Sequence, residues 1–105
     1  MKPKVSVIIP CYNYADYLKL CLQSVFNQTF QDFEVIVVDD ASTEDIEVVV
    51  KQFGDSRIKY VRNRFNLGQT KSINIGLKIS SGEFITIIGA DDLMLENNLE
   101  DKIKL

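Results

Sequence analysis

Four short apolar runs alternate with four segments of helical periodicity along this chain, and this alternation limits the possible folds more than any other feature. The runs cover residues 5–9, 33–38, 58–61 and 84–88, and most are rich in valine and isoleucine, as buried strands require. Strands that alternate with helices at this spacing form parallel sheets with right-handed crossovers and helices on both faces. We therefore expect an α/β fold with three layers, α/β/α, around a mostly parallel, Rossmann-like sheet.

Local signals give expected ends for the first elements. Pro10 lacks the backbone N–H that a central strand needs, so the first strand should stop there. Asn13 or Asp16 would cap the helix that follows. Residues 42–45 resemble a capping box that opens the second helix, and Gly54 would end it.

The second half of the chain continues the alternation. Residues 69–79 show a helical pattern, with Ile73, Gly76 and Leu77 expected on its inner side. The run 84–88 carries no charge, so we expect a strand that is covered on both faces.

The composition excludes several classes of function. With 12 basic and 15 acidic residues the net charge is −3, which gives no electrostatic reason to expect nucleic acid as a partner. The chain contains no histidine, so Ser-His-Asp nucleophiles, Cys-His nucleophiles and histidine-bound zinc are excluded. Cys11 and Cys21 match neither a redox pair nor a zinc site, and we expect both to be reduced.

The length and the short apolar runs lead to expectations about domain count and location. A chain of 105 residues is enough for one small domain. Its apolar runs are too short to span a bilayer, and polar residues interrupt the N-terminal stretch before it could act as a signal peptide. We therefore expect no transmembrane segment and a cytoplasmic location, either of the chain or of a larger protein to which it belongs.

Two pairs of aspartates directly follow predicted strands. Asp39 and Asp40 come after the second run, and Asp91 and Asp92 come soon after the fourth. Taken alone, the second pair is more simply explained as the N-cap of the next helix. The carboxyl ends of parallel strands meet at one edge of a sheet, however, and ligands bind there. Adjacent carboxylates repel one another unless a cation or hydroxyl donors lie beside them, so the two pairs are candidates for one ligand site.

The common nucleotide-binding loops do not match. No glycine follows the first run, where a dinucleotide-binding fold needs G-x-G-x-x-G, and Thr70 stands before Lys71 where a P-loop needs a glycine. A flavodoxin-like receiver domain has acidic strand ends and a similar length. Its phosphoacceptor belongs on the third strand, however, which here ends in residues 60–62, Tyr-Val-Arg. The receiver domain remains a weaker competitor.

Six segments together resemble the family 2 glycosyltransferases of the GT-A fold. They are V-S-V-I-I-P-C-Y-N at 5–13, S-V-F-N-Q-T-F at 24–30, V-I-V-V-D-D-A-S-T at 35–43, N-L-G at 66–68, N-I-G at 74–76 and G-E-F-I-T-I-I-G-A-D-D at 82–92. The resemblance implies transfer of a sugar, with inversion, from a nucleoside diphosphate, with UDP as the expected nucleotide, to an acceptor hydroxyl. It also implies that residues 1–105 form a single nucleotide-diphospho-sugar-binding domain, a truncated GT-A fold at the N-terminal part of a longer enzyme.

The resemblance assigns nucleotide-binding roles to Pro10, Tyr12, Asn13, Asp40 and Asp91. Tyr12 would stack on the base, usually uracil, and Asp40 would accept the ring N–H, because a carboxylate is only an acceptor. Asp91 would hold ribose hydroxyls or a metal-bound water. Asn13 is equally explained as a cap of the first helix, and Asp39 as an acceptor of backbone N–H groups in its own loop.

The same resemblance makes Asp92 the ligand of a divalent cation, Mg²⁺ or Mn²⁺, in a D-x-D-like element. Such a cation prefers oxygen ligands and neutralises the charge that builds on the diphosphate as the sugar leaves. Many relatives carry an aspartate where this chain has Gly89, so ligation would depend more on Asp92. Many relatives also carry arginine at the position of Ile73, and Lys71 would either approach a phosphate or, more simply, remain solvated.

The family's catalytic base and acceptor site belong to a part of the enzyme that follows this domain. We therefore predict no catalytic residue within 1–105, and an acceptor, either a glycan or a lipid-linked sugar, that binds elsewhere. This would place the parent enzyme in polysaccharide biosynthesis, at the inner face of the membrane. An uncovered edge at the fourth strand would allow self-association. The alternative function is a non-catalytic nucleotide-binding or interaction module with the same fold.

Overall fold

A single parallel sheet forms the centre of the molecule. The computed structural model describes residues 2–104, and its strands are β1 (Val5–Cys11), β2 (Phe33–Asp39), β3 (Ile58–Arg62) and β4 (Phe84–Ile87). They lie in the order β3-β2-β1-β4, and every neighbouring pair is parallel. The predicted sheet is confirmed, and the carboxyl ends of all these strands lie at one edge.

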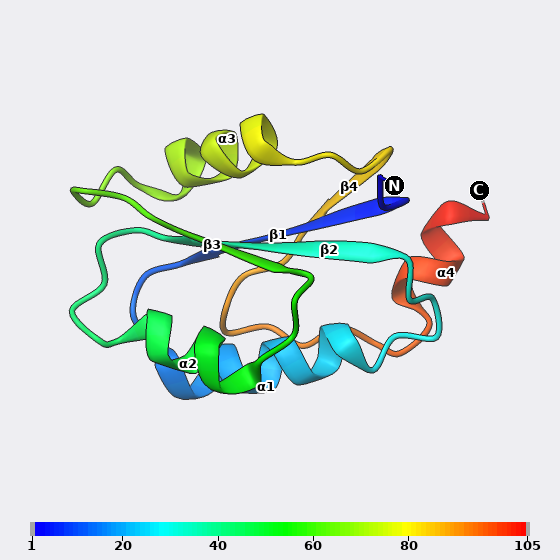
Figure 1. Cartoon of the computed structure of the whole chain (residues 1–105), viewed down its shortest axis with the longest axis horizontal. Coiled ribbons are helices and arrows are strands. Elements are labelled where there is room, and N and C mark those ends of the chain that lie inside the picture. The colour runs from blue at the N-terminus through cyan, green and yellow to red at the C-terminus, as the bar shows by residue number, and fades with distance from the viewer. Residues whose placement is uncertain (1, 105) are drawn as a thin grey trace.

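Helices cover both faces of the sheet (Figure 1). They are α1 (Ala15–Phe26), α2 (Ile46–Phe53), α3 (Gln69–Ile79) and the short α4 (Asn98–Ile103). The helices α1 and α2 lie together on one face, and α3 lies on the other. The predicted three-layer architecture is therefore confirmed. Within residues 2–104, the length and hydropathy of the helices are insufficient for any of them to cross a membrane.

The hydrophobic core is larger on the face of α1 and α2. There, the valine and isoleucine side chains of β1 and β2 pack against Leu18 and Leu22 of α1 and against residues of α2. On the opposite face, the buried apolar cluster consists of Ile8, Ile36 and Val38, with Ile75 of α3 packed against it. Most of the buried apolar side chains therefore lie between the sheet and the helices α1 and α2. The helix α3 has fewer apolar contacts with the sheet.

The helix α3 approaches the sheet through small residues. Ser72 and Gly76 are buried, and a Cβ on Gly76 would lie only 2.7 Å from Ile8 Cγ2. The predicted inward position of Gly76 is thus confirmed. The same prediction for Leu77 is wrong, because this side chain is 40% exposed. With Gly76 against β1, the next residue lies about 100° further around the helix and points away from the sheet.

The strand β1 continues through Pro10, so the prediction that it stops there is wrong. Pro10 lies opposite Val38 of β2. Even-numbered residues of β1 turn their backbone groups toward β4, as the hydrogen bond from Ile88 N to Ile8 O shows. The strand β4 has ended at Ile87, before it would reach Pro10. The missing N–H of proline therefore removes no hydrogen bond from the sheet.

The strand β4 forms one edge of the sheet. Among residues 2–104, only β1 pairs with it. Phe84, Ile85 and Ile87 are exposed, whereas Thr86 is buried. The prediction that this strand is covered on both faces is therefore wrong. A run of uncharged β-branched residues indicates a strand, but it does not distinguish an edge strand from a central one.

Two helix caps differ from the predicted ones. Tyr14 is the N-cap of α1, with φ +63°, and its own side chain makes no capping hydrogen bond. The Glu44 carboxylate instead accepts a hydrogen bond from Ala15 N at 3.0 Å. The helix α2 is capped by Asp45, whose carboxylate accepts a hydrogen bond from Val48 N at 3.2 Å. Gly54 follows α2 with φ +74°, as predicted for a left-handed C-terminal residue. Asn13, a predicted cap, binds a distant loop instead.

Candidate functional site

The carboxyl edge of the sheet contains an open cavity of about 290 Å³. This is near the lower limit for ligand pockets, which occupy roughly 300–1,000 Å³. Four of the six predicted site residues line it, namely Pro10, Tyr12, Asp40 and Asp91. The structure therefore brings together side chains that follow three different strands, β1, β2 and β4.

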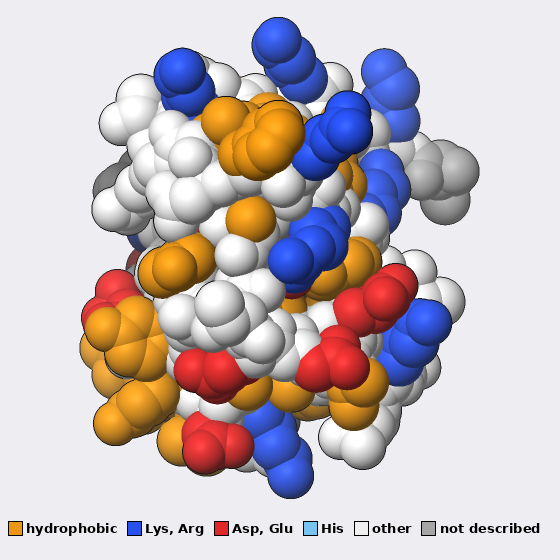
Figure 2. All heavy atoms as spheres, turned by 90° about the vertical axis from the view of Figure 1, so that its left-hand side faces the viewer, with side chains coloured by type: hydrophobic (Ala, Val, Ile, Leu, Met, Phe, Trp, Pro, Cys, Tyr) orange, Lys and Arg blue, Asp and Glu red, His pale blue; other side chains and the backbone are white. Residues whose placement is uncertain are grey.

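Charge is distributed unevenly over this edge. Figure 2 looks onto it with α3 uppermost, and most lysine and arginine side chains lie in the upper half, whereas the acidic ones lie in the lower half. The exposed cations of α3 and the preceding loop include Arg64, Lys71 and Lys78. An anionic ligand in the cavity would thus have a cationic flank on one side and carboxylates on the other.

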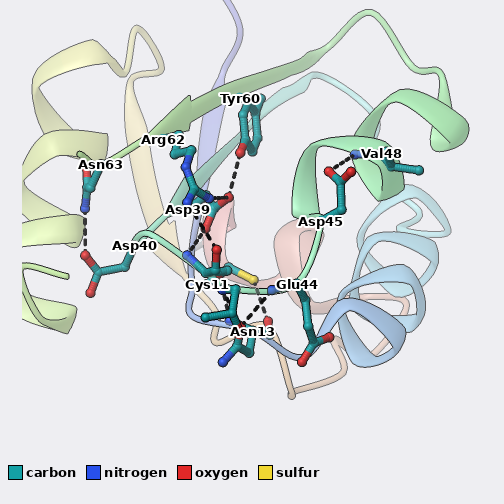
Figure 3. A network of polar contacts seen from close by, with 12 residues as sticks. Cys11, Asn13, Asp39, Asp40, Glu44, Asp45, Val48, Tyr60, Arg62 and Asn63 are labelled. Carbon is teal, nitrogen blue, oxygen red and sulfur yellow. Dashed lines mark hydrogen bonds and ion pairs between the residues drawn. The ribbon is translucent and has the colours of Figure 1, made fainter. Parts of the chain in front are cut away.

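Asp39 is fully buried and organises the loop after β2 (Figure 3). Its Oδ1 accepts a hydrogen bond from Ser42 N at 3.0 Å. Its Oδ2 accepts from the Tyr60 hydroxyl at 2.6 Å and from the Arg62 guanidinium at 3.0 Å. Burial and the neighbouring carboxylate raise the pKa of Tyr60, so its phenol remains a donor. These contacts support the loop-organising role considered for Asp39.

Asp40 is 5% exposed and fixes the loop that leads into α3. Its Oδ1 accepts from Leu67 N at 2.7 Å and from Asn63 Nδ2 at 2.9 Å, and its Oδ2 accepts from Gly68 N at 2.9 Å. Burial raises the pKa of Asp40, but hydrogen bonds from these groups and from Ser72 outweigh burial. The net pKa therefore lies below its ordinary value. An ionised carboxylate thus lines the cavity at neutral pH.

Asn13 joins the loop after β1 to the loop before α2 (Figure 3). Its backbone N–H donates to Ser42 Oγ at 2.7 Å. Its side-chain Oδ1 accepts from Thr43 N at 2.9 Å and from Glu44 N at 3.2 Å. The residue has φ +60°, a conformation that asparagine tolerates better than most residues. The alternative role as a cap of α1 is therefore wrong, and direct contact with a nucleotide stays a prediction.

Tyr12 offers an aromatic surface to the cavity. Its side chain lines the cavity and is 46% exposed, so the ring remains accessible to a ligand. Tyr14 lines the same cavity and contacts Tyr17 edge to face, with ring centroids 5.6 Å apart. Pro10 is buried at the end of β1 and forms part of the same wall. Exposed aromatic rings of this kind are suited to stacking on a nucleobase.

Asp91 and Asp92 are exposed and lie on the turn after β4. The turn is closed by a hydrogen bond from Asp92 N to Gly89 O at 3.0 Å. Asp91 lines the cavity, whereas Asp92 faces an adjoining hollow that also contains Thr86 and Lys102. Within residues 2–104, neither carboxylate takes part in a hydrogen bond or an ion pair. Both carboxylates are therefore free to bind a ligand.

Gly89 lies next to both of these carboxylates. A Cβ on Gly89 would lie 3.1 Å from Asp91 Oδ1 and 3.1 Å from Asp92 Oδ2, so the two oxygens surround a point that glycine leaves open. No group of three or more His, Cys, Asp or Glu side chains within residues 2–104 could hold a metal ion. However, Mg²⁺ is commonly held by one or two carboxylates together with substrate phosphates. The residues present therefore fit a divalent cation that binds together with a diphosphate.

Asn63 and Ser72 belong to the site, although no sequence motif indicates them. The Asn63 amide is buried and donates to Asp40 Oδ1 at 2.9 Å and to Ser72 Oγ at 3.0 Å. Ser72 is also buried and lines the cavity. The N-L-G segment at 66–68 could have indicated the backbone hydrogen bonds to Asp40, because glycine favours the positive φ of +93° that Gly68 adopts in this turn. Asn63 gives no such signal, because its partner Asp40 lies 23 residues earlier.

Cys11 and Cys21 are buried and have free thiols, as expected for a reduced pair. Burial raises the pKa of each thiol to about 12, and nearby carboxylates contribute in the same direction. Both thiols therefore stay protonated at neutral pH. A thiolate nucleophile at this site is excluded, because the thiol form is a poor nucleophile.

Comparison with known proteins identifies the family. The model of the family described as Glycosyl transferase family 2 matches residues 6–105. The chain belongs to glycosyl transferase family 2. The resemblance based on the six segments is confirmed, and the receiver domain is excluded as an alternative.

Two relatives illustrate the range of the family. An uncharacterised glycosyltransferase of Rickettsia bellii is 45% identical over 102 residues, which cover 96% of this chain and 15% of the relative. WfgD of Escherichia coli, named a UDP-Glc:alpha-D-GlcNAc-diphosphoundecaprenol beta-1,3-glucosyltransferase, is 37% identical over 101 residues, which cover 96% of this chain and 40% of the relative. This family 2 chain thus spans less than half the length of each of these curated relatives.

Solved structures of similar proteins confirm the GT-A fold. TarS 1–349 of S. aureus in complex with UDP has a TM-score of 0.86 and 35% identity, and the match covers 99% of this chain and 31% of the TarS 1–349 chain. The mannosyltransferase PcManGT of Pyrobaculum calidifontis, in complex with GDP-Man and Mn²⁺, has a TM-score of 0.81 and 29% identity. That match covers 89% of this chain and 29% of PcManGT.

Proposed function

We propose that this chain supplies the part of an inverting glycosyltransferase that binds the sugar donor and a metal ion. The enzyme would move a sugar from a nucleoside diphosphate, with UDP as the expected nucleotide, to an acceptor hydroxyl. The observation that carries the proposal is the cavity at the carboxyl edge, which is lined by an exposed aromatic ring, a buried ionised carboxylate and the free carboxylate of Asp91, with the free carboxylate of Asp92 in the adjoining hollow. Each of these groups suits a different part of a nucleotide sugar.

Tyr12 and Asp40 suit the base. Stacking of a base on an exposed aromatic ring contributes about 1–3 kcal/mol. Uracil offers a ring N–H at N3, and a carboxylate is only an acceptor. Asp40 Oδ2 accepts one backbone hydrogen bond, from Gly68 N, and a carboxylate oxygen has two acceptor positions. Pro10 and Asn13 complete the proposed nucleotide-binding set, Asn13 through the loop that it holds.

Asp91 and Asp92 suit the ribose and the diphosphate. Asp92 would hold Mg²⁺ or Mn²⁺, and Asp91 would hold ribose hydroxyls or a metal-bound water. The cation, when bound, supplies neutralisation of the negative charge on the diphosphate leaving group. The position of both carboxylate oxygens around one point beside Gly89 supports this assignment.

The names of relatives support the classes of sugar donor and acceptor. WfgD is named for UDP-Glc and a diphosphoundecaprenol-linked sugar, the TarS structure contains UDP, and the PcManGT structure contains GDP-Man and Mn²⁺. For the whole enzyme we therefore propose a glycan or a lipid-linked sugar as acceptor and a role in polysaccharide biosynthesis. The short coverage of relatives supports a catalytic base and acceptor site outside residues 1–105.

Two further expectations stay predictions. Self-association through the β4 edge is supported by the exposure of Phe84, Ile85 and Ile87. Light scattering at high protein concentration would test it, and a monomeric mass would contradict it. A cytoplasmic location at the inner face of the membrane is supported by the lipid-linked substrates named for relatives.

Isothermal titration calorimetry with UDP, with and without Mn²⁺, tests the proposed function. We expect binding that strengthens with Mn²⁺ and that exceeds the binding of other nucleoside diphosphates. A UDP affinity that does not change when Mn²⁺ is added would favour the non-catalytic nucleotide-binding module. Absence of nucleotide binding under both conditions would contradict the proposal.

A further inference from the structure

The turn that carries the second aspartate pair is attached to α1 at both of its ends. Before the pair, the Cys21 thiol donates a hydrogen bond to Gly89 O at 3.7 Å. After the pair, Ser24 Oγ accepts a hydrogen bond from Met94 N at 3.0 Å. Cys21 and Ser24 are three residues apart and are therefore neighbours on one face of the helix. A single helical turn thus fixes both ends of the aspartate turn.

Gln28 extends this attachment further along the chain. Its side chain is buried, with the residue only 2% exposed. Its Nε2 donates to Leu95 O at 2.6 Å, and its Oε1 accepts from Leu99 N at 3.0 Å. The same Nε2 donates to Ser24 O at 3.2 Å, which holds the amide against α1. Both ends of one buried amide therefore bind the segment that follows the aspartates.

Apolar packing anchors the same segment. Ala90, Met94 and Leu99 belong to the main core cluster, together with Leu22 and Val25 of α1. The backbone groups bound by Ser24 and Gln28 thus lie close to the core, where a donor without a partner costs about 1–3 kcal/mol. The aspartate turn therefore has little freedom to move relative to α1.

The motif at 24–30 acquires a role from these contacts. Ser24 lies in the last turn of α1, and Gln28 lies two residues beyond the end of the helix, where its amide is held against Ser24 O. Thr29 adds a hydrogen bond from its backbone N to Glu96 O at 2.7 Å. Ser24, Gln28 and Thr29 lie beside residues 94–99, and none of them lines the cavity. Their hydrogen bonds to this part of the chain go to the backbone of residues 94–99, apart from one from Thr29 Oγ1 to the Glu100 carboxylate.

We propose that Ser24 and Gln28 are positioning residues for the metal site. This inference depends on the proposed function, since it concerns the cation that Asp91 and Asp92 would hold. Adjacent carboxylates repel one another, and a loose turn would let them separate. By fixing the turn, Ser24 and Gln28 keep both carboxylates beside Gly89 before a cation arrives, so cation binding does not have to order the turn.

The test compares the effect of Mn²⁺ on UDP affinity in four variants. Ser24→Ala and Gln28→Ala remove the two positioning side chains, and Ser24→Thr restores the hydroxyl. Gln31→Ala is the matched control, because Gln31 also binds the end of α1, donating to Phe26 O at 3.1 Å and to Gln28 O at 2.6 Å, while its side chain makes no hydrogen bond to residues 89–99 within the described part of the chain. The measured quantity is the ratio of the UDP dissociation constants without and with Mn²⁺, obtained by calorimetry.

Ser24→Ala and Gln28→Ala should each reduce this ratio about tenfold, the effect expected for a residue that orients a metal ligand. The UDP affinity without metal should stay within about twofold of the wild-type value. Ser24→Thr and Gln31→Ala should retain the wild-type ratio. Circular dichroism confirms folding of each variant. If Gln28→Ala does not fold, the comparison of Ser24→Ala with Ser24→Thr decides the question.

The outcomes separate this inference from the proposed function. If the UDP affinity of the wild-type protein does not change with Mn²⁺, the positioning role and the proposed function are both overturned. A wild-type protein that responds to Mn²⁺, with variants that respond equally, overturns only the positioning role. An equal loss of UDP affinity with and without Mn²⁺ in Ser24→Ala also overturns it, because general disruption of the site would explain that result.

Discussion

The two aspartate pairs follow strands at the same edge of the sheet, yet their surroundings are opposite. Asp39 and Asp40 are 0% and 5% exposed, and each of their carboxylate oxygens accepts a hydrogen bond from the protein. Asp91 and Asp92 are exposed, and no donor within residues 2–104 binds their carboxylates. The protein holds both carboxylates of the first pair, of which Asp40 lines the cavity, and the second pair remains available to a ligand.

The position of each strand in the sheet explains this difference. The strand β2 lies between β1 and β3, so loops from both neighbours surround its end. Tyr60, Arg62 and Asn63, at the end of β3 and just after it, reach the first pair. The strand β4 is at the edge, with β1 as its partner among the described strands. One dipeptide, Asp-Asp, is therefore held by protein donors in one place, where Asp40 also lines the cavity, and offers two free carboxylates in the other.

Among the variants that compare the two aspartate pairs, removal of Asp39 should cause the largest loss in the free energy of unfolding. Asp39→Ala leaves the Tyr60 hydroxyl and the Arg62 guanidinium without their shared acceptor. Breaking a buried ion pair costs about 3–5 kcal/mol, and we expect about 3 kcal/mol because Arg62 also reaches solvent. Urea unfolding followed by circular dichroism measures the loss. In the matched variant Asp91→Ala the change should stay below about 0.5 kcal/mol, and equal losses would contradict the contrast.

Replacement of Asp40 should affect both stability and base selectivity. In Asp40→Asn, the new amide N–H₂ would face backbone N–H groups that now donate to a carboxylate, at a cost of about 1–3 kcal/mol. The preference for UDP over other nucleoside diphosphates should also be lost. Urea unfolding and calorimetry measure the two effects. Unchanged selectivity would show that Asp40 does not contact the base.

Acid should remove the contribution of Asp40 to stability. Its folded pKa lies below the unfolded value of about 3.9, so the unfolded chain takes up the proton first as the pH falls. The stabilisation is complete above the unfolded pKa and is lost as the pH falls through the folded pKa. The difference in free energy of unfolding between the wild type and Asp40→Asn should therefore be constant from pH 7 to about 5 and shrink below about 4. A difference that persists undiminished to pH 2 would argue against this carboxylate as the cause.

Asp92→Asn should change ligand binding and leave stability unchanged. The carboxylate has no protein partner within residues 2–104, so the free energy of unfolding should stay within about 0.5 kcal/mol. With Mn²⁺ present, UDP affinity should fall about tenfold, which is about 1.4 kcal/mol. Calorimetry with and without Mn²⁺ measures this loss. If the variant binds UDP and Mn²⁺ as well as the wild type does, the metal assignment is wrong.

Gly89→Ala should give the smallest effect and tests the geometry of the free pair. The added methyl group would lie 3.1 Å from one oxygen of each free aspartate, so both carboxylates must move by a few tenths of an ångström. We expect the Mn²⁺ enhancement of UDP binding to fall about threefold, or about 0.6 kcal/mol. UDP affinity without metal serves as the internal reference and should fall less than the affinity with Mn²⁺, although Gly89 and Asp91 both line the cavity. An unaltered Mn²⁺ effect would show that the cation binds away from Gly89.

Several local predictions were wrong because they used information from one strand or helix only. Pro10 was expected to end β1, and it does not, because β4 ends before it reaches that residue. The run 84–88 was expected to be covered on both faces, but β4 lies at the edge. Asparagine is a residue type that often caps helices, but Asn13 binds the loop before α2. In each case the outcome depends on a segment far away in sequence.

The positioning contacts of α1 show the same limit at the candidate site. The motif at 24–30 could be recognised from the sequence, but its purpose could not. Ser24 and Gln28 meet backbone groups of Met94 and Leu99, which lie about 70 residues later. A serine in the last turn of a helix and a glutamine just beyond its end give no local sign of such partners.

By itself, the sequence determined the order of strands and helices, because the periodicity of apolar residues is a local property. It also placed both aspartate pairs after strands, and hence at one edge of a parallel sheet. Only the tertiary structure decided which pair is buried. The donors that bind Asp39 and Asp40 from β3 and the following loop lie 21 to 28 residues away in sequence, and the strand order leaves β4 at the edge. Burial and hydrogen-bond partners depend on what the fold brings near a residue, and for these carboxylates that decides which are held by protein donors and which stay free to bind a cation.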